Sequence, residues 1–179
     1  MQKTVLKNLE PGTKVLLASD VYGDLAIRLA DFIGSDGHLD VVDVSPVQVE
    51  NCRQKLQQHD HVNVRQDDLA NLKGFQYDAI VCFFLLHEIP EDYKHLIVTA
   101  LLQNLAPGGK VVFVDYHKPG PWHPLKGVMS VIFDALEPFA KSLWINEIGD
   151  FAPASNDFHW RKETFFGGLY QKVVVERRS

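Results

Sequence analysis

The chain has 179 residues, of which 46% are hydrophobic and 23% are charged, and its formal net charge is -5. This length and composition predict a single globular domain over residues 1–179 with a properly buried core. The acidic balance argues against nucleic acid as a partner, because phosphate binding needs a face rich in lysine and arginine.

The cysteines and the N-terminal residues indicate a cytoplasmic location. Cys52 and Cys82 lie thirty residues apart and form no paired redox or zinc motif. Residues 1–10 contain no apolar signal segment. The longest apolar run, Ala79–Leu86, is far shorter than the ~20 residues that cross a bilayer.

Strand-like and helix-like segments alternate over the first 120 residues, which predicts β-α-β units and a parallel sheet. The predicted strands are Lys14–Ala18, Leu39–Val44, Val62–Arg65, Ala79–Phe84 and Lys110–Asp115. The predicted helices are Gly23–Ile33, a segment that begins at Ser45-Pro46, and Glu91–Leu105. Pro107-Gly108-Gly109 is expected to end the last of these helices as a C-terminal cap.

The character of the chain changes after Lys118. His123–Ile148 is apolar and aromatic and predicts one helix or two, with a kink near Pro138. Phe158–Phe166 and Leu169–Glu176 are joined by Gly167-Gly168 and predict a closing antiparallel hairpin. The fold class is therefore α/β: a single Rossmann-like, doubly wound, mostly parallel sheet with a C-terminal antiparallel hairpin.

Four of the predicted parallel strands end in acidic or polar side chains. These are Asp20 and Asp24 after the first strand, Asp43 at the end of the second, Asp67 and Asp68 after the third, and His87 and Glu88 after the fourth. Ligands of open parallel sheets bind in the crevice beyond the carboxyl ends of the strands. The pattern therefore predicts a site for a nucleotide-type cofactor.

With these motifs in this order, the chain resembles the class I S-adenosylmethionine-dependent methyltransferases, whose sheet has seven strands. More narrowly it is similar to the ubiquinone/menaquinone C-methyltransferases, and most of all to the methyltransferase-like rhodoquinone-biosynthesis family. The segments that carry the narrower resemblance are Val21–Asp24, Leu86–Pro90, His123–Leu125 and Lys162–Lys172. The resemblance covers nearly the whole chain.

The first loop departs from the pattern of this family. Leu17 stands at the usual acidic position, and Ser19 and Val21 stand at two glycine positions. Gly23 is the one glycine that remains. We expect Asp20 to replace the missing carboxylate as the partner of the methionine ammonium, with the backbone of Val21 and Gly23 facing the cofactor.

The resemblance assigns the remaining cofactor contacts to the ends of the next strands. It implies that Asp43 binds both ribose hydroxyls and that Asp68 meets the adenine amino group, with Asp67 as the alternative. Val44 and Leu69 belong to the same predicted set. Phe83, or its neighbour Phe84, begins the loop where this family lines the methyl-transfer site.

Two histidines are candidate bases for the reaction. Methyl transfer requires an aligned nucleophile and the removal of its proton, and an imidazole is suited to that task. His87 and His117 follow the fourth and fifth strands, with Asp115 beside them, and each has the alternative role of a hydrogen-bonded loop residue. Tyr22 is expected to shape the space around the sulfonium.

The two histidines form a possible metal-ligand set with Asp115 and Glu88, but no tight ligand spacing such as HExxH occurs, so the residues themselves favour a site without metal. The resemblance to the rhodoquinone family nevertheless implies a divalent metal, manganese in particular, as an alternative cofactor beside S-adenosylmethionine. A set formed by His87, His117, Asp115 and Glu88 would be its ligands.

The acceptor that these features imply is a small apolar or aromatic molecule, with a quinone as the leading candidate. The apolar residues of segment 122–145 either pack on the sheet, form a substrate lid, or contact the inner face of a membrane. Three functions stay open: methyl transfer, the replacement of a quinone methoxy group by an amino group as the rhodoquinone family implies, and cofactor binding without catalysis.

Overall fold

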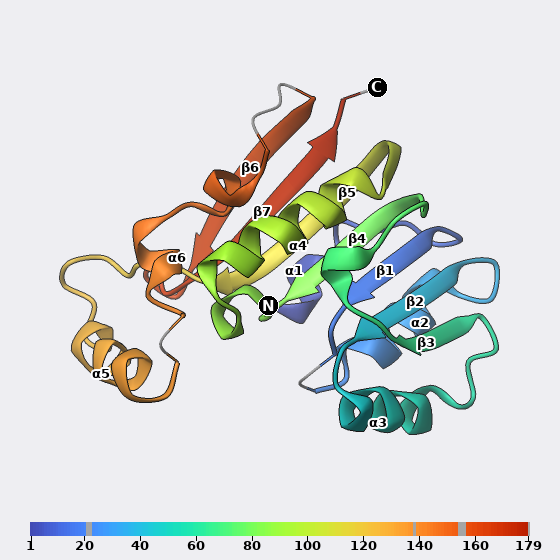
Figure 1. The fold of residues 1–179 in the computed structure, drawn as a ribbon, viewed down its shortest axis with the longest axis horizontal. Coiled ribbons are helices and arrows are strands. Elements are labelled where there is room, and N and C mark those ends of the chain that lie inside the picture. The colour runs from blue at the N-terminus through green and yellow to red at the C-terminus, as the bar shows by residue number, and fades with distance from the viewer. Residues whose placement is uncertain (21–22, 138, 154–156, 179) are drawn as a thin grey trace.

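A computed structural model describes residues 1–20, 23–137, 139–153 and 157–178. Its centre is a seven-stranded sheet in the order β3-β2-β1-β4-β5-β7-β6 (Figure 1). The strands are β1 (Lys14–Ala18), β2 (His38–Asp43), β3 (Val62–Gln66), β4 (Tyr77–Phe83), β5 (Leu105–Tyr116), β6 (Phe158–Phe165) and β7 (Tyr170–Arg177). Strands β1 to β5 pair in parallel, and β7 pairs antiparallel with β5 and β6. The predicted fold class and the terminal hairpin are confirmed.

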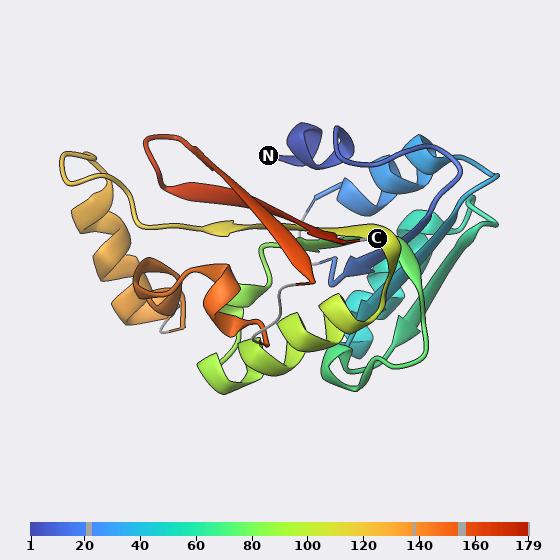
Figure 2. The same cartoon turned by 90° about the horizontal axis from the view of Figure 1, so that it is seen from above.

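Helices cover both faces of the sheet, with α1 and α2 on one side and α4 on the other (Figure 2). The α-helices are α1 (Gln2–Leu6), α2 (Leu25–Ile33), α3 (Pro46–Leu56), α4 (Glu91–Gln103), α5 (Lys126–Leu136) and α6 (Ser142–Ile145). Three single 3-10 turns are η1 (Leu69–Asn71), η2 (Leu86–Glu88) and η3 (Ile148–Phe151). Helix α1 was not among the predicted elements.

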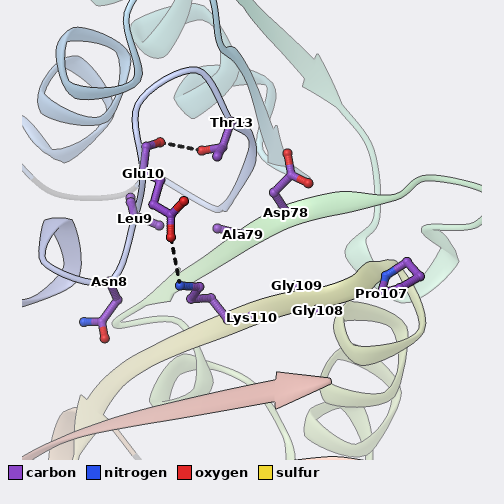
Figure 3. A pocket seen from close by; sticks show the side chains of 10 residues that line it. All are labelled: Asn8, Leu9, Glu10, Thr13, Asp78, Ala79, Pro107, Gly108, Gly109 and Lys110. Atoms are coloured by element: carbon purple, nitrogen blue, oxygen red, sulfur yellow. Dashed lines mark hydrogen bonds and ion pairs between the residues drawn. The ribbon is translucent and has the colours of Figure 1, made fainter. Parts of the chain in front are cut away.

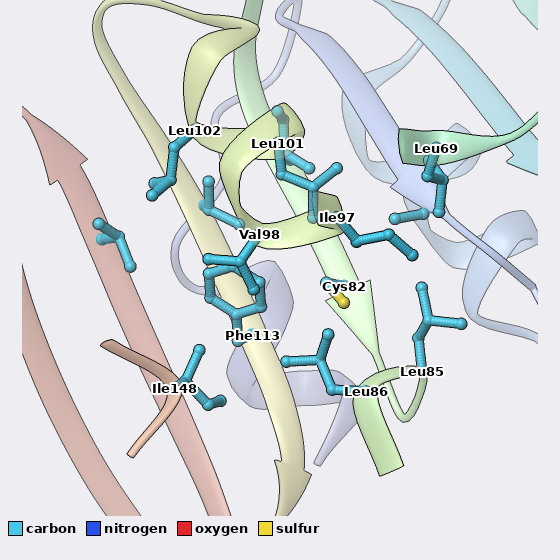
Figure 4. Close-up of a cluster of buried hydrophobic side chains, with 14 of the residues drawn as sticks. Leu69, Cys82, Leu85, Leu86, Ile97, Val98, Leu101, Leu102, Phe113 and Ile148 are labelled. Atoms are coloured by element: carbon cyan, nitrogen blue, oxygen red, sulfur yellow. The ribbon is translucent and has the colours of Figure 1, made fainter. Parts of the chain in front are cut away.

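The alternating pleat of the strands builds two separate cores. Leu16 and Ala18 of β1 pack toward α4, whereas Val15 and Leu17 pack toward α1, α2 and α3. Figure 4 shows the first of these cores, in which α4 lays its apolar side chains over Phe113 and its neighbours on the sheet. The sheet is therefore covered on both faces, and the edge where its parallel strands end is the natural place for a ligand.

The prediction that Pro107-Gly108-Gly109 caps the helix is wrong. Helix α4 ends at Gln103, and Asn104 is its cap. The Asn104 side chain donates to the carbonyl oxygens of Leu72 and Ala100 at 2.9 and 2.8 Å. The glycines lie within β5, where the register against β4 jumps from the pair Tyr77–Leu105 to the pair Ala79–Lys110.

Close backbone approach explains why this irregular stretch of β5 contains Gly109. A Cβ atom on Gly109 would come within 2.8 Å of the Tyr77 carbonyl oxygen. The glycine therefore makes room for the neighbouring strand rather than for the turn after a helix.

Two further segments compare with the prediction as follows. Helix α2 begins at Leu25 with Asp24 as its N-cap, so Gly23 precedes it. The apolar segment after Pro121 forms two helices, α5 and the short α6, which is the second of the two predicted alternatives; α5 ends at Glu137, whose φ is -133°. The predicted kink at Pro138 lies outside the described residues. No helix within the described ranges is both long and apolar enough to cross a bilayer.

Candidate cofactor and methyl-transfer site

A cavity of about 310 Å³ opens at the carboxyl ends of the parallel strands. Its wall comes from the loops that follow β1, β2, β3 and β4, together with one face of α4. The residues that line it are Ser19, Asp43, Val44, Ser45, Gln48, Asp68, Leu69, Leu85, Glu88, Ile89, Tyr93 and Ile97. Of the predicted cofactor residues, the structure therefore brings Asp43, Val44, Asp68 and Leu69 to one cavity.

Asp43 lies at the centre of a hydrogen-bond network that joins the first two strand ends. Its carboxylate accepts the Ser19 hydroxyl at 2.6 Å and the Ser45 backbone N–H at 2.8 Å. Asp43 is 8% exposed, and its remaining lone pairs are available to a ligand in the cavity. The next helix, α3, is capped by the Ser45 hydroxyl, which accepts from the Gln48 N–H, so Asp43 is not needed as a cap.

Ser19 keeps the backbone conformation of the glycine that it replaces. Its φ is +67°, in the left-handed region that glycine adopts most easily. Its N–H donates to the Val42 carbonyl oxygen at 2.9 Å, and its hydroxyl is the one bound to Asp43. These two bonds stabilise a turn that would otherwise favour glycine.

The far end of the cavity carries a second carboxylate. Asp68 accepts from the Ala70 N–H at 2.9 Å and from the hydroxyl of Tyr93 on α4. Asp67 instead lies exposed, where it accepts the Asp68 N–H and pairs with Arg65 at 3.6 Å. Asp68, and not Asp67, therefore faces the cavity.

Asp20 lies beneath the first loop, outside the lining of the cavity. Its carboxylate contacts Lys55 Nζ at 3.4 Å and the Cys52 sulfur at 3.9 Å. Lys55 also donates to the Gly23 carbonyl oxygen at 3.3 Å, so it ties α3 to this loop. Burial raises the pKa of Asp20 although Lys55 opposes the shift, and burial together with Asp20 raises the pKa of Cys52 to about 12.

Asp115 and His87 form a buried pair beside the cavity. Asp115 accepts the His87 Nδ1–H at 2.9 Å, and it also accepts the N–H groups of Leu86 and Tyr116 at 2.9 and 2.8 Å. This arrangement leaves His87 Nε2 as the second ring nitrogen, 3.8 Å from Glu88 Oε1. Burial lowers the pKa of His87, but the hydrogen bond and the charge of Asp115 outweigh it, so the pKa is raised above its usual value.

Two aromatic rings contact His87, and a third and a fourth ring continue the cluster. The His87 ring lies 4.7 Å from Tyr116 and 6.0 Å from Phe84 between ring centroids. Phe133 of α5 lies 4.9 Å from Tyr116 and 5.1 Å from Trp144. Among the described residues, two buried polar atoms in this region have no hydrogen-bond partner: Trp144 Nε1 and Glu137 Oε2.

The structure separates the second predicted base from the first. His117 Nδ1 donates to the Gly168 carbonyl oxygen at 2.9 Å, and its Nε2 faces Lys162 Nζ at 3.4 Å. Both ring nitrogens are thus engaged by the hairpin and its neighbours. Within the described ranges no three histidine, cysteine or acidic side chains gather closely enough to hold a metal ion, so the set of His87, His117, Asp115 and Glu88 does not form.

The predictions for Val21 and Tyr22 lie outside the described residues, and Phe83 is not part of the cavity wall. Phe83 packs its ring edge-on against Phe84 at 4.9 Å and joins the core on the α2 side. The loop after β4 reaches the cavity through Leu85, Glu88 and Ile89 instead.

Residues of α3 and α4 also line the cavity, and they were not among the predicted site residues. Gln48 follows the Ser45 cap by three residues, a spacing typical of a helix start, and this could have placed it at the cavity. Tyr93 and Ile97 are four residues apart and share one face of α4, but nothing in that pattern distinguishes a cavity wall from ordinary core.

A second cavity, of about 210 Å³, lies at the opposite edge of the sheet (Figure 3). It opens where β1 and β4 begin, between the irregular stretch of β5 and the loop after α1. Lys110 reaches Glu10 there at 4.0 Å. Its position at the amino ends of the strands sets it apart from the candidate cofactor site.

The strand order and the carboxylate at the end of β2 define a class I methyltransferase architecture. Solved structures with this fold include the following two. A SAM-dependent methyltransferase from Aquifex aeolicus superposes with a TM-score of 0.66 at 17% identity, over 98% of this chain and 89% of that one. The N-methyltransferase NodS from Bradyrhizobium japonicum superposes with a TM-score of 0.68 at 16% identity, over 99% and 95%.

Residues 22–111 match the family described as methyltransferase domain, and the chain belongs to this family of S-adenosylmethionine-dependent methyltransferases. Curated relatives include the ubiquinone/menaquinone biosynthesis C-methyltransferase UbiE of Shewanella piezotolerans, which is 26% identical over 61% of this chain and 45% of its own length. The demethylmenaquinone methyltransferase of Staphylococcus epidermidis is 25% identical over 89% of this chain and 63% of its own length. The chain thus spans about half to two thirds of the length of these relatives.

Proposed function

We propose that the chain binds S-adenosylmethionine in the cavity beyond β1, β2 and β4 and transfers its methyl group to a small aromatic acceptor. The observation that carries this proposal is Asp43. It is a buried carboxylate, fixed by Ser19 and Ser45, with acceptor capacity left for two ribose hydroxyls. Asp68, together with the apolar side chains of Val44 and Leu69, offers a place for the adenine ring.

The Asp115–His87 pair supplies the base. When bound, S-adenosylmethionine would supply an activated methyl group to the acceptor atom, and its sulfur would keep the electron pair of the broken bond. The acceptor loses one proton, which His87 Nε2 takes up. Asp115 holds the Nδ1–H and so stabilises the imidazolium that results.

Two features favour an aromatic, quinone-type acceptor. The rings of Phe84 and Tyr116 are partly exposed and offer faces on which a flat molecule can stack. The names of the relatives point the same way, since they are methyltransferases of ubiquinone and menaquinone biosynthesis.

The test is the mass of the product. The protein is incubated with S-adenosylmethionine and a panel of demethylated and methoxylated quinones in reduced form, with and without manganese. A gain of one methyl on the quinone together with S-adenosylhomocysteine supports the proposal. Exchange of methoxy for amino identifies the rhodoquinone-type reaction. Bound cofactor without turnover of any quinone refutes the acceptor class.

A second proposal concerns an exposed apolar surface on α5 and the loop before it, through which the protein would reach a membrane that contains the apolar acceptor. Leu125, Val128 and Val131 recur every third residue and form one exposed stripe, and Trp122 just before them is 95% exposed. Figure 1 shows α5 at the margin of the molecule, far from β1 to β3. Lys126 adds positive charge to the same helix. We propose that this stripe docks on an anionic bilayer, where an apolar quinone is dissolved.

Sedimentation with lipid vesicles tests the docking surface. Val131→Ser should reduce binding to vesicles that contain anionic lipid, and Val47→Ser on α3 should not, although the two valines are 68% and 66% exposed. Equal binding by both variants and the wild type, or no preference for anionic over zwitterionic vesicles, would overturn the membrane proposal and leave the cofactor site unaffected.

A further inference from the structure

The cofactor has positive charge at its sulfonium and at its ammonium group, and the site must accommodate both. Leu17, at the usual acidic position, is fully buried in the core toward α2. Asp20 is already paired with Lys55 and does not line the cavity. Neither residue offers a free carboxylate to the cation.

Glu88 is the remaining carboxylate on the cavity wall. Asp43 and Asp68 each accept two donors from the protein, as described above. Within the described part of the chain, the contact of Glu88 with another charged side chain is the 3.8 Å approach to His87 Nε2, longer than a hydrogen bond. Its side chain is 35% exposed at the cavity, so its oxygen atoms remain accessible to a ligand.

We infer that Glu88 is the side chain that pairs with the positive charge of the bound cofactor, in place of the carboxylate missing at Leu17 and of Asp20. This inference rests on the proposed binding of S-adenosylmethionine. Its location supports it, because Glu88 follows β4 beside the Asp115–His87 pair, where the methyl group must be presented. The charged groups that act on it are His87, Asp115, Glu137 and Asp43.

The electrostatics of the empty cavity agree with this role. Burial raises the pKa of Glu88, and the neighbouring carboxylates raise it further against the opposing effect of His87. An ionised Glu88 is therefore poorly compensated by the protein itself. A cation in the cavity would supply the missing compensation.

Three ligands distinguish the contribution of the two positive charges from that of the rest of the cofactor. S-adenosylmethionine has both cations, S-adenosylhomocysteine has the ammonium alone, and 5′-methylthioadenosine has neither. Calorimetry should show that Glu88→Gln weakens S-adenosylmethionine about 10- to 100-fold, as expected for a charge-assisted contact. Affinity for 5′-methylthioadenosine should stay within about twofold. Glu91→Gln, a change of the same kind at an exposed position of α4 outside the cavity, should leave all three affinities unchanged.

The pattern of loss assigns the contact. Weaker binding of S-adenosylmethionine and S-adenosylhomocysteine indicates the ammonium, and weaker binding of S-adenosylmethionine alone indicates the sulfonium. The inference is overturned if Glu88→Gln loses affinity equally for all three ligands, or loses none. The proposed function is unaffected in either case as long as the wild type binds S-adenosylmethionine. If the wild type binds none of the three, the proposed function itself fails.

A measurement on the wild type covers the case in which Glu88→Gln does not fold. Protonation of Glu88 removes its charge, so affinity for S-adenosylmethionine should fall with decreasing pH before affinity for 5′-methylthioadenosine does. Asp43 contacts the part that both ligands share, so its protonation affects them equally. A ratio of the two affinities that is constant with pH overturns the inference.

Discussion

Replacing Asp43 by alanine should weaken cofactor binding more than any other single change at the nucleoside end of the cavity. Asp43 is 8% exposed, and its carboxylate accepts hydrogen bonds from Ser19 and Ser45 at 2.6 and 2.8 Å. In the alanine variant no neighbouring side chain can therefore take the place of this carboxylate at the ribose. A hydrogen bond to a charged group contributes about 1.5–3 kcal/mol. The dissociation constant for S-adenosylmethionine should therefore rise roughly 10- to 150-fold.

Part of that loss could come from the first loop, because Ser19 loses its acceptor in the same variant. A ligand lacking the 2′-hydroxyl separates the two effects. The wild type should bind 2′-deoxy-5′-methylthioadenosine less tightly than 5′-methylthioadenosine, whereas Asp43→Ala should bind the two alike. The difference between the two proteins is the coupling of Asp43 to the ribose.

Asp36→Ala is the matched control, since Asp36 is an exposed acidic residue in the turn between α2 and β2. It should leave calorimetric affinity and thermal unfolding unchanged. The reasoning is refuted if Asp43→Ala remains folded and binds S-adenosylmethionine as the wild type does. It is also refuted if the 2′-hydroxyl matters equally in both proteins, because the ribose would then be held elsewhere.

Three further changes test the proposed catalytic pair and two contacts that stabilise the fold. Asp115→Asn removes the charge that raises the pKa of His87, so the rise of methyl transfer with pH, which follows the neutral imidazole, should move to lower pH; an unshifted profile excludes His87 as the base. Lys55→Gln leaves the buried Asp20 without its cation and should lower the free energy of unfolding by about 1–3 kcal/mol in denaturant titration; unchanged stability means that the ion pair contributes nothing. Gly109→Ala forces a Cβ against a carbonyl oxygen at 2.8 Å and should cost about 1–3 kcal/mol, measured by thermal unfolding; an unaltered melting temperature means that β5 shifts freely.

The parallel half of the fold could be predicted because each strand and its following helix carry a local signal. Apolar runs such as Ala79–Phe84 mark buried strands, and Ser45-Pro46 marks the start of α3. The prediction failed where the chain is shaped by distant contacts. The glycines after α4 look like a helix stop, but their role is set by the Tyr77 carbonyl on another strand.

The candidate site was predictable to a similar degree. Asp43 ends β2 and Asp68 follows β3, so their place at the crevice comes from topology alone. The bond between Asp43 and Ser19 was not predictable in this way, because Ser19 follows the neighbouring strand β1. Distinguishing Asp68 from Asp67, or His87 from His117, needs the direction of each side chain. That direction depends on partners such as Tyr93 and Gly168, which lie 25 and 51 residues away in the sequence.

The altered first loop shows why a motif can be lost while its geometry persists. Glycine provides a left-handed turn without steric cost, and Ser19 adopts that turn at φ +67° because its hydroxyl and its N–H are both bound by β2. Lys55 adds a third restraint through the Gly23 carbonyl. The lost acidic residue is a different matter, since no backbone bond can substitute for a charge. A carboxylate must be supplied by another element, and we infer that Glu88, on the turn after β4, supplies it.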